Sequence, residues 1–330
     1  MTQTSHATPT PPAALTQVPM SSAELPALDP PCPAWPGSVR EHGGVRLHVR
    51  HTPGPDQQTA VYVHGLGGSA SNWTDLAAAL GPNATGLALD LPGFGLSEPD
   101  EGFGYTLAEH ADTVTRFVAS LDTGPVHLLG NSMGGAVSLL VAANRPDLVR
   151  TLTLVSPAMP DLRPALSRVS DPRLPLAMLP VIGKRVRAKL AGMTARERVE
   201  QVIRLCFHDP DSVPASRVEE AEAETMERMR LRWASAALNM STVGIIRAWF
   251  SLGAGSLWSI PPKVRVPTLV VWGAEDRVVS VRKATRTAQL LPNARLLVLP
   301  RTGHVAQMEH PATVARAVLG MWEAHRVGTW

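Results

Sequence analysis

The chain has 330 residues, of which 44% are hydrophobic, and its formal net charge is only +3. This length suffices for one large core with an inserted subdomain, or for two small domains. The charge is small and no basic stripe is interleaved with aromatic residues, which argues against nucleic-acid binding. No stretch reaches the roughly 18 uninterrupted apolar residues that a membrane span requires, so none is expected.

The N-terminal segment and the cysteines bear on the cellular compartment. Residues 1–38 are rich in Pro, Thr, Ser and Ala, a composition that predicts a disordered tail. Residues 1–36 contain neither Lys nor Arg and no continuous apolar core, so a secretion signal is not predicted. Two cysteines, Cys32 and Cys206, cannot form a disulfide framework and are expected to be free thiols. Together these features favour a cytoplasmic protein.

Predicted strands and helices alternate along the first half of the chain. The strands cover residues 44–51, 59–64, 85–91, 125–130 and 148–155. The helices cover residues 72–80, 106–121 and 133–144. Thr106, with Glu109 three residues later, forms a capping-box pattern at the start of the second helix. This alternation predicts an α/β fold whose central sheet is mainly parallel and flanked by helices.

The pattern changes in residues 158–262, where helix-like stretches follow one another without a convincing strand. Beyond them, residues 267–273 and 294–300 are typical of buried strands. We interpret residues 158–262 as a helical cap inserted into one α/β core, made of residues 39–157 and 263–330. Such a cap would cover the active site, exclude water and supply an apolar pocket.

Ser132 lies where a predicted strand meets a predicted helix, in the sequence G-N-S-M-G-G. A serine hydroxyl is a poor nucleophile unless a base removes its proton, so it must be presented sharply to a partner. A strand-to-helix turn does this, and Gly130 and Gly134 stand where any Cβ would collide with the turn. Taken alone, the motif also fits a glycine-rich loop with a capping serine.

An acid and a histidine follow Ser132, each just beyond one of the two later strands. Asp276 and His304 therefore lie at the carboxyl ends of parallel strands, which meet at one edge of a sheet. Glu275 is adjacent, but the spacing G-x-x-D-x-x-V selects Asp276. Asp161, near the end of an earlier strand, is a minor alternative for the acid. The order serine, acid, histidine differs from that of other serine-enzyme folds.

Between Val45 and Arg326 the chain resembles an α/β-hydrolase of the single-domain, capped kind. The motifs that carry the resemblance are H-G-L-G-G from residue 64, D-L-P-G-F-G-L-S from residue 90, G-N-S-M-G-G, W-G-A-E-D-R-V-V from residue 272 and T-G-H from residue 302. The resemblance implies the corresponding fold and a serine nucleophile. It points to the branch that contains esterases, lipases and C–C bond hydrolases.

The resemblance also implies a role for each site residue. His304 would take the proton of Ser132 and return it to the leaving group, while Asp276 orients the imidazole ring. The backbone N–H groups of Leu66 and Met133 would stabilise the oxyanion of the tetrahedral intermediate. We therefore expect these five residues to form the catalytic machinery.

Five further residues are candidates for lining the substrate pocket. For the apolar ones among them, packing within the core of the cap is the alternative. They are Asn131, Met159, Trp233, Trp249 and Val305.

No metal or other cofactor is predicted, because the histidines show no ligand spacing such as H-E-x-x-H and the cysteines are isolated. His64 precedes the oxyanion turn and His127 lies inside a predicted strand. Both are expected to be structural.

A serine nucleophile argues against epoxide-opening and halide-displacing relatives, which use a carboxylate at this position. The sequence G-H-V-A-Q-M-E-H-P from residue 303 resembles C–C bond hydrolases as well as many esterases. C–C bond hydrolases usually carry tryptophan directly after the catalytic histidine, whereas this chain has Val305. We therefore favour a serine hydrolase that forms an acyl-enzyme on a small-molecule, hydrophobic carboxylic ester. Cleavage of ring-fission diketones is the second hypothesis, and a non-catalytic binding protein is the third. The sequence predicts no oligomeric state.

Overall fold

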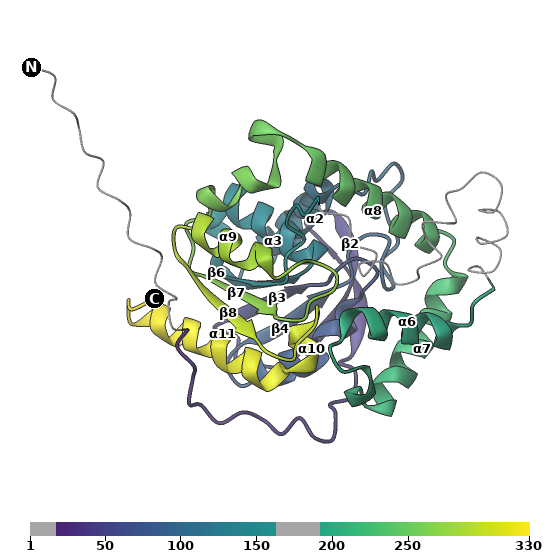
Figure 1. The fold of residues 1–330 in the computed structure, drawn as a ribbon, viewed down its shortest axis with the longest axis horizontal. Coiled ribbons are helices and arrows are strands. Elements are labelled where there is room, and N and C mark those ends of the chain that lie inside the picture. The colour runs from purple at the N-terminus through teal and green to yellow at the C-terminus, as the bar shows by residue number, and fades with distance from the viewer. Residues whose placement is uncertain (1–17, 163–191) are drawn as a thin grey trace, which may run out of the picture.

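The computed structural model describes residues 18–162 and 192–330 of the chain (Figure 1). Residues 1–17 of the predicted tail and residues 163–191 of the predicted cap lie outside the described residues.

The core is one eight-stranded sheet with strand order β1-β2-β4-β3-β5-β6-β7-β8. The strands are β1 (Gly37–His42), β2 (Val45–Thr52), β3 (Thr59–Val63), β4 (Thr85–Leu89), β5 (Val126–Asn131), β6 (Val149–Val155), β7 (Thr268–Gly273) and β8 (Ala294–Leu299). Strands β1 and β2 run antiparallel to each other, β2 runs antiparallel to β4, and all other pairings are parallel. The prediction of a mainly parallel sheet is confirmed.

Helices cover both faces of the sheet (Figure 1). They are α1 (Thr74–Leu80), α2 (Leu107–Ala119), α3 (Met133–Asn144), α9 (Arg282–Leu290), α10 (Ala306–Glu309) and α11 (Pro311–Arg326). Buried side chains of α2, α3 and α9 form one hydrophobic cluster with the sheet, and those of α1 and α11 form another. The central strands β3, β5 and β7 are buried along their whole length, as expected for parallel strands covered on both faces.

Helix boundaries follow local sequence signals. Helix α3 spans the predicted residues 133–144. The predicted capping box also forms at α2: Glu109 N donates to Thr106 Oγ1 (3.2 Å), and Thr106 N donates to Glu109 Oε2 (3.0 Å). Strand β1 was not predicted, because all but its last residue is exposed and its side chains do not alternate between apolar and polar.

The prediction of a disordered tail is wrong for residues 18–38, which lie against the core. Ser21 N donates to Arg316 O (2.9 Å), and Ser21 Oγ donates to Glu323 Oε1 (2.6 Å), so this segment is fixed to α11. Trp35 Nε1 donates to Thr74 O at the start of α1 (3.0 Å). The apolar residues scattered among the prolines pack against the cluster of α1 and α11; they are Val18, Ala23, Leu25, Leu28 and Trp35.

In the described part of the insertion between β6 and β7, the α-helices are α6 (Ala195–Cys206), α7 (Ala215–Arg230) and α8 (Ala234–Phe250). They lie at one end of the sheet (Figure 1). Helix α8 contacts the loop after β3, where Leu238 lies close to Gly67. The residues just after α6 contact the loop after β8. No described helix combines the length and apolarity needed to cross a membrane.

Candidate active site

The backbone places Ser132 on a sharp turn between β5 and α3. Its φ of 53° and ψ of −117° lie outside the regions that a serine normally adopts, which costs on the order of 1–3 kcal/mol. Two hydrogen bonds hold this conformation: Ser132 N donates to Val155 O (3.0 Å), and Ala158 N donates to Ser132 O (2.9 Å). Strand β6 and its following residues thus support the strained turn.

Two glycines allow α3 to approach the sheet closely at this turn. A Cβ on Gly130 would collide with Gly134 O and Ser138 Oγ. A Cβ on Gly134 would collide with the carbonyl oxygens of Val63 and His64, at the end of β3. Both positions therefore require glycine for space, as the sequence pattern predicted.

Asp276 and His304 come together from the loops after β7 and β8. Asp276 Oδ2 accepts a hydrogen bond from His304 Nδ1 (2.9 Å), and the exposed fractions of the two side chains are 0% and 5%. Asp276 Oδ1 accepts from the backbone N–H groups of Val278 (2.8 Å) and Val279 (2.9 Å). Because its second oxygen is fixed by these donors, the carboxylate holds the imidazole with Nδ1 protonated and Nε2 available as a base.

The two alternative acids have other partners. Glu275 Oε2 accepts from Thr302 N (3.0 Å), which ties the acid loop to the histidine loop. Asp161 Oδ1 forms an ion pair with Lys283 Nζ (3.3 Å) on α9. The structure therefore brings Asp276, and not these two residues, to His304.

The turn after β3 lies against Ser132. A Cβ on Gly65 would be 3.0 Å from the Cβ of Ser132. In the described part of the chain, the backbone N–H groups of Leu66 and Met133 have no hydrogen-bond acceptor. Two unpaired donors beside a serine could bind an oxyanion.

His64 shapes this turn as a neutral residue. Its Nε2 accepts from Leu91 N (3.0 Å), so its Nδ1 carries the proton and donates to Gly65 O (2.7 Å). Burial lowers the pKa of His64. Both ring nitrogens are occupied, so His64 acts as a brace for the turn and not as a second base. His127 is likewise occupied, by Thr151 Oγ1 (2.8 Å) and Gln58 Oε1 (2.9 Å).

Asn131 links the serine turn to the histidine loop. Its side-chain amide donates to Val155 O (3.1 Å) and to His304 O (3.2 Å), and the residue is buried. No hydrogen bond joins Ser132 Oγ to His304 Nε2 among the described residues. Such contacts are often long before substrate binds.

The other proposed pocket residues have different surroundings. Met159 is fully buried in the core cluster of α2 and α3, which favours its packing role. Trp249 Nε1 donates to Ala158 O (2.9 Å), so this residue attaches α8 to the segment after β6. Val305 is buried directly after His304, at the start of α10.

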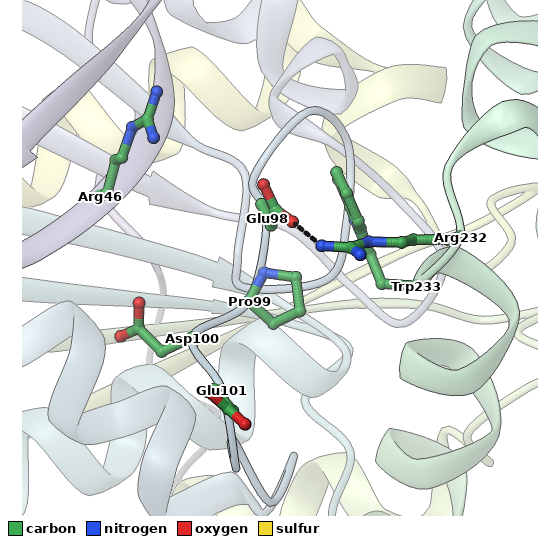
Figure 2. Close-up of a pocket in the computed structure, with 7 residues that line it drawn as sticks. All are labelled: Arg46, Glu98, Pro99, Asp100, Glu101, Arg232 and Trp233. Carbon is green, nitrogen blue, oxygen red and sulfur yellow. Dashed lines mark hydrogen bonds and ion pairs between the residues drawn. The ribbon is translucent and has the colours of Figure 1, made fainter.

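Trp233 lines a polar cavity of about 550 Å³ (Figure 2). Glu98 and Arg232 form an ion pair across this cavity (2.9 Å). The other lining residues are Arg46, Pro99, Asp100 and Glu101. None of the proposed catalytic residues lines this cavity, so its geometry does not support Trp233 as part of an apolar pocket over the serine.

Sequence reasoning missed Glu309, at the end of α10. Its Oε1 accepts from Gly303 N (2.7 Å), next to His304, and its Oε2 accepts from His208 N (2.8 Å), just beyond α6. The only signal available was its place five residues after the histidine in the G-H-V-A-Q-M-E-H-P sequence.

Comparisons with known proteins agree with this architecture. A family model described as the alpha/beta hydrolase fold matches residues 61–311. A curated relative from Pseudomonas putida, the dihydrolipoyllysine-residue acetyltransferase component of an acetoin cleaving system, is 31% identical over 86% of this chain and 69% of its own length. The 2-hydroxy-6-oxo-6-phenylhexa-2,4-dienoate hydrolase of Burkholderia cepacia is 26% identical over 86% of this chain and 93% of its own.

A solved structure of a bacterial membrane phospholipase A has the same fold. It superposes with a TM-score of 0.70 at 23% identity, covering 89% of this chain and 87% of that one. The family model spans most of the chain, and its match includes the serine turn and both loops that carry the acid and the histidine. The chain therefore belongs to the α/β-hydrolase fold family.

Proposed function

We propose that this hydrolase uses Ser132 as a nucleophile and forms an acyl-enzyme on a hydrophobic carboxylic ester. The observation that carries the proposal is the Asp276–His304 hydrogen bond, on the loop that Asn131 ties to the serine turn. A neutral imidazole oriented in this way is the base that a serine hydroxyl requires.

In the first step, His304 Nε2 takes the hydroxyl proton while Ser132 Oγ attacks the acyl carbon. The carbonyl electrons move onto oxygen, and the N–H groups of Leu66 and Met133 stabilise the resulting charge, each contributing roughly 3 kcal/mol. The intermediate then collapses, and the imidazolium of His304 gives its proton to the leaving alkoxide. Water attacks the acyl-enzyme by the same route, which releases the acid and restores the serine.

The apolar residues near the site support a hydrophobic substrate. Leu238 of α8 lies against Gly67, in the turn that would hold the oxyanion. Val305 offers a small apolar side chain directly after the histidine, where C–C bond hydrolases usually have tryptophan. This residue is the reason that we place ester hydrolysis first.

Hydrolysis of a C–C bond in a ring-fission diketone is the second candidate. It is favoured by the relative from Burkholderia cepacia, whose name gives a 2-hydroxy-6-oxo-dienoate as its substrate. The acetyl-transfer reaction of the Pseudomonas putida relative is not carried over, because this chain spans only 69% of that protein. A non-catalytic binding protein would need no aligned acid–histidine pair, so that hypothesis ranks last.

The test is the initial rate on nitrophenyl esters of increasing acyl length, beside a vinylogous ring-fission diketone. The Ser132→Ala protein is the blank, and it should be slower by several orders of magnitude. Serine-dependent turnover that peaks at one ester length, with the diketone untouched, supports the ester hydrolase. Faster turnover of the diketone would replace it with the C–C hydrolase, and ligand binding without serine-dependent turnover would favour a binding protein.

A further inference from the structure

The residues at and after the end of α6 bond to both loops that carry the acid and the histidine. Arg277 Nη1, next to Asp276, donates to Arg204 O (3.0 Å). His304 N donates to Cys206 O (2.6 Å). The segment 204–208, part of the insertion between β6 and β7, thus lies directly on the proposed catalytic pair.

Glu309 also takes part in this junction between segment 204–208 and the loop that carries His304. One of its carboxylate oxygens binds the N–H of Gly303, and the other binds the N–H of His208. A single side chain therefore connects the residue before His304 to the insertion. Hydrogen bonds in which the acceptor is ionised are roughly twice as strong as neutral ones.

The junction is tightly packed. A Cβ on Gly303 would collide with Cys206 O, and the side chain of Phe207 is buried. Burial, together with the negative charges of Asp276 and Glu309, raises the pKa of the Cys206 thiol to about 12. The thiol is therefore neutral.

We propose that Glu309 is a positioning residue: it holds segment 204–208 against the histidine loop, and it thereby fixes His304 relative to Ser132. The inference rests on the proposed serine mechanism for its effect on rate. The junction itself is a physical contact that can be tested without any substrate.

Glu309→Gln is the informative substitution, because it keeps the shape of the side chain and changes one acceptor into a donor. The new amide would face the N–H of either Gly303 or His208, so one of the two bonds must be lost. We expect kcat to fall by roughly 10- to 100-fold, as when a catalytic group is misplaced by about 1 Å. KM should change much less, because Glu309 lies outside the proposed oxyanion site.

The same reasoning gives a pH signature. Burial raises the pKa of Glu309 above its usual value. The side chains that face Glu309 and titrate are His208 and His310, whose positive forms lower its pKa, and the neutral Cys206. As the pH falls through this raised pKa, the wild-type protein gains a proton on Glu309 and loses an acceptor. The ratio of wild-type to E309Q rates should therefore decrease towards one at low pH and remain constant at high pH.

The experiment combines ester kinetics across pH with amide hydrogen exchange on the purified proteins. Glu98→Gln is the matched control, because it breaks an exposed ion pair to Arg232, between α7 and α8, in a cavity that none of the proposed catalytic residues lines. The expected result for E309Q is faster exchange in at least one of the two segments, 204–208 and 300–304, and the pH-dependent loss of kcat. E98Q should match wild type in both measurements. If E309Q does not fold, Glu309→Asp serves instead, because the shorter side chain cannot reach both donors.

Unchanged exchange in both segments would overturn the proposed junction. Faster exchange in either segment with an unchanged kcat, or a loss of rate with no pH dependence, would overturn the positioning role. If wild type itself shows no serine-dependent turnover, the proposed function fails, and the exchange measurement still decides whether Glu309 joins the two segments.

Discussion

Replacing Asp276 by asparagine would separate the electrostatic role of this carboxylate from its structural role. Oδ1 accepts from two backbone N–H groups, those of Val278 and Val279. An asparagine can keep both bonds only if its oxygen takes the Oδ1 position, which places its amide nitrogen against His304 Nδ1. The reverse orientation would leave two buried donors without an acceptor, at a cost of about 1–3 kcal/mol each. The loop thus fixes the orientation of the introduced amide.

The amide nitrogen is a donor, so Nδ1 of His304 must lose its proton and Nε2 must carry it. A protonated Nε2 cannot accept the hydroxyl proton of Ser132. We expect kcat to fall about 10⁴-fold, as for the corresponding substitution in serine proteases, which corresponds to about 5.4 kcal/mol of activation free energy. Because both backbone bonds remain, the melting temperature should change by no more than about 4 °C.

The assay is kcat on the best nitrophenyl ester, together with a thermal unfolding curve of each protein. Glu275→Gln is the matched control, since it makes the same chemical change one residue away and should be mild. A D276N protein that retains more than a tenth of the wild-type kcat would refute the claim that Asp276 sets the histidine tautomer. A large loss in E275Q alone would move the acid to Glu275.

Two further predictions concern the turn and the core. Gly134→Ala should lower the free energy of unfolding by about 1–3 kcal/mol and also reduce kcat, because the added Cβ pushes α3 away from the carbonyl of His64. Urea unfolding and ester kinetics test this prediction. An unchanged free energy of unfolding and an unchanged kcat would contradict it. Burial, with smaller effects of nearby positive charges, lowers the pKa of His127 to about 3. Below about pH 6.5, the His127 imidazole therefore gains a proton in the unfolded chain but stays neutral in the folded chain. Between pH 7 and pH 5, the free energy of unfolding should therefore decrease by about 2 kcal/mol more in the wild-type protein than in the His127→Gln protein. Urea unfolding at both pH values measures this difference. An equal decrease in the two proteins would argue against the neutral, buried state of His127.

Much of the core could be predicted because its signals are local. Helix α3 begins directly after Ser132, and the glycines at 130 and 134 mark the close approach of helix and strand. The capping box at Thr106 needs only four consecutive residues to form. The pairing of Asp276 with His304 followed from another simple rule, since both residues come just after parallel strands.

The remaining features depend on contacts between distant parts of the chain. The segment around Ser21 has the composition of a disordered tail, yet α11 supplies a backbone acceptor and a carboxylate for it. Strand β1 is held by its backbone pairing with β2, which side-chain patterns do not report. Trp233 fitted an apolar pocket by residue type alone, but its cavity is also lined by charged residues that are distant in the sequence, Arg46 on β2 and Glu98 on the loop after β4.

The attachments of the insertion also suggest how one core can serve different substrates. At the histidine side, segment 204–208 binds through backbone N–H and C=O groups, which any sequence could supply, and through Glu309. At the turn after β3, α8 meets the core through the apolar side chain of Leu238. Backbone bonds fix position without depending on side-chain size, whereas apolar contacts change with every substitution. The geometry of His304 can therefore stay constant while substitutions in α8 alter the surroundings of the turn after β3.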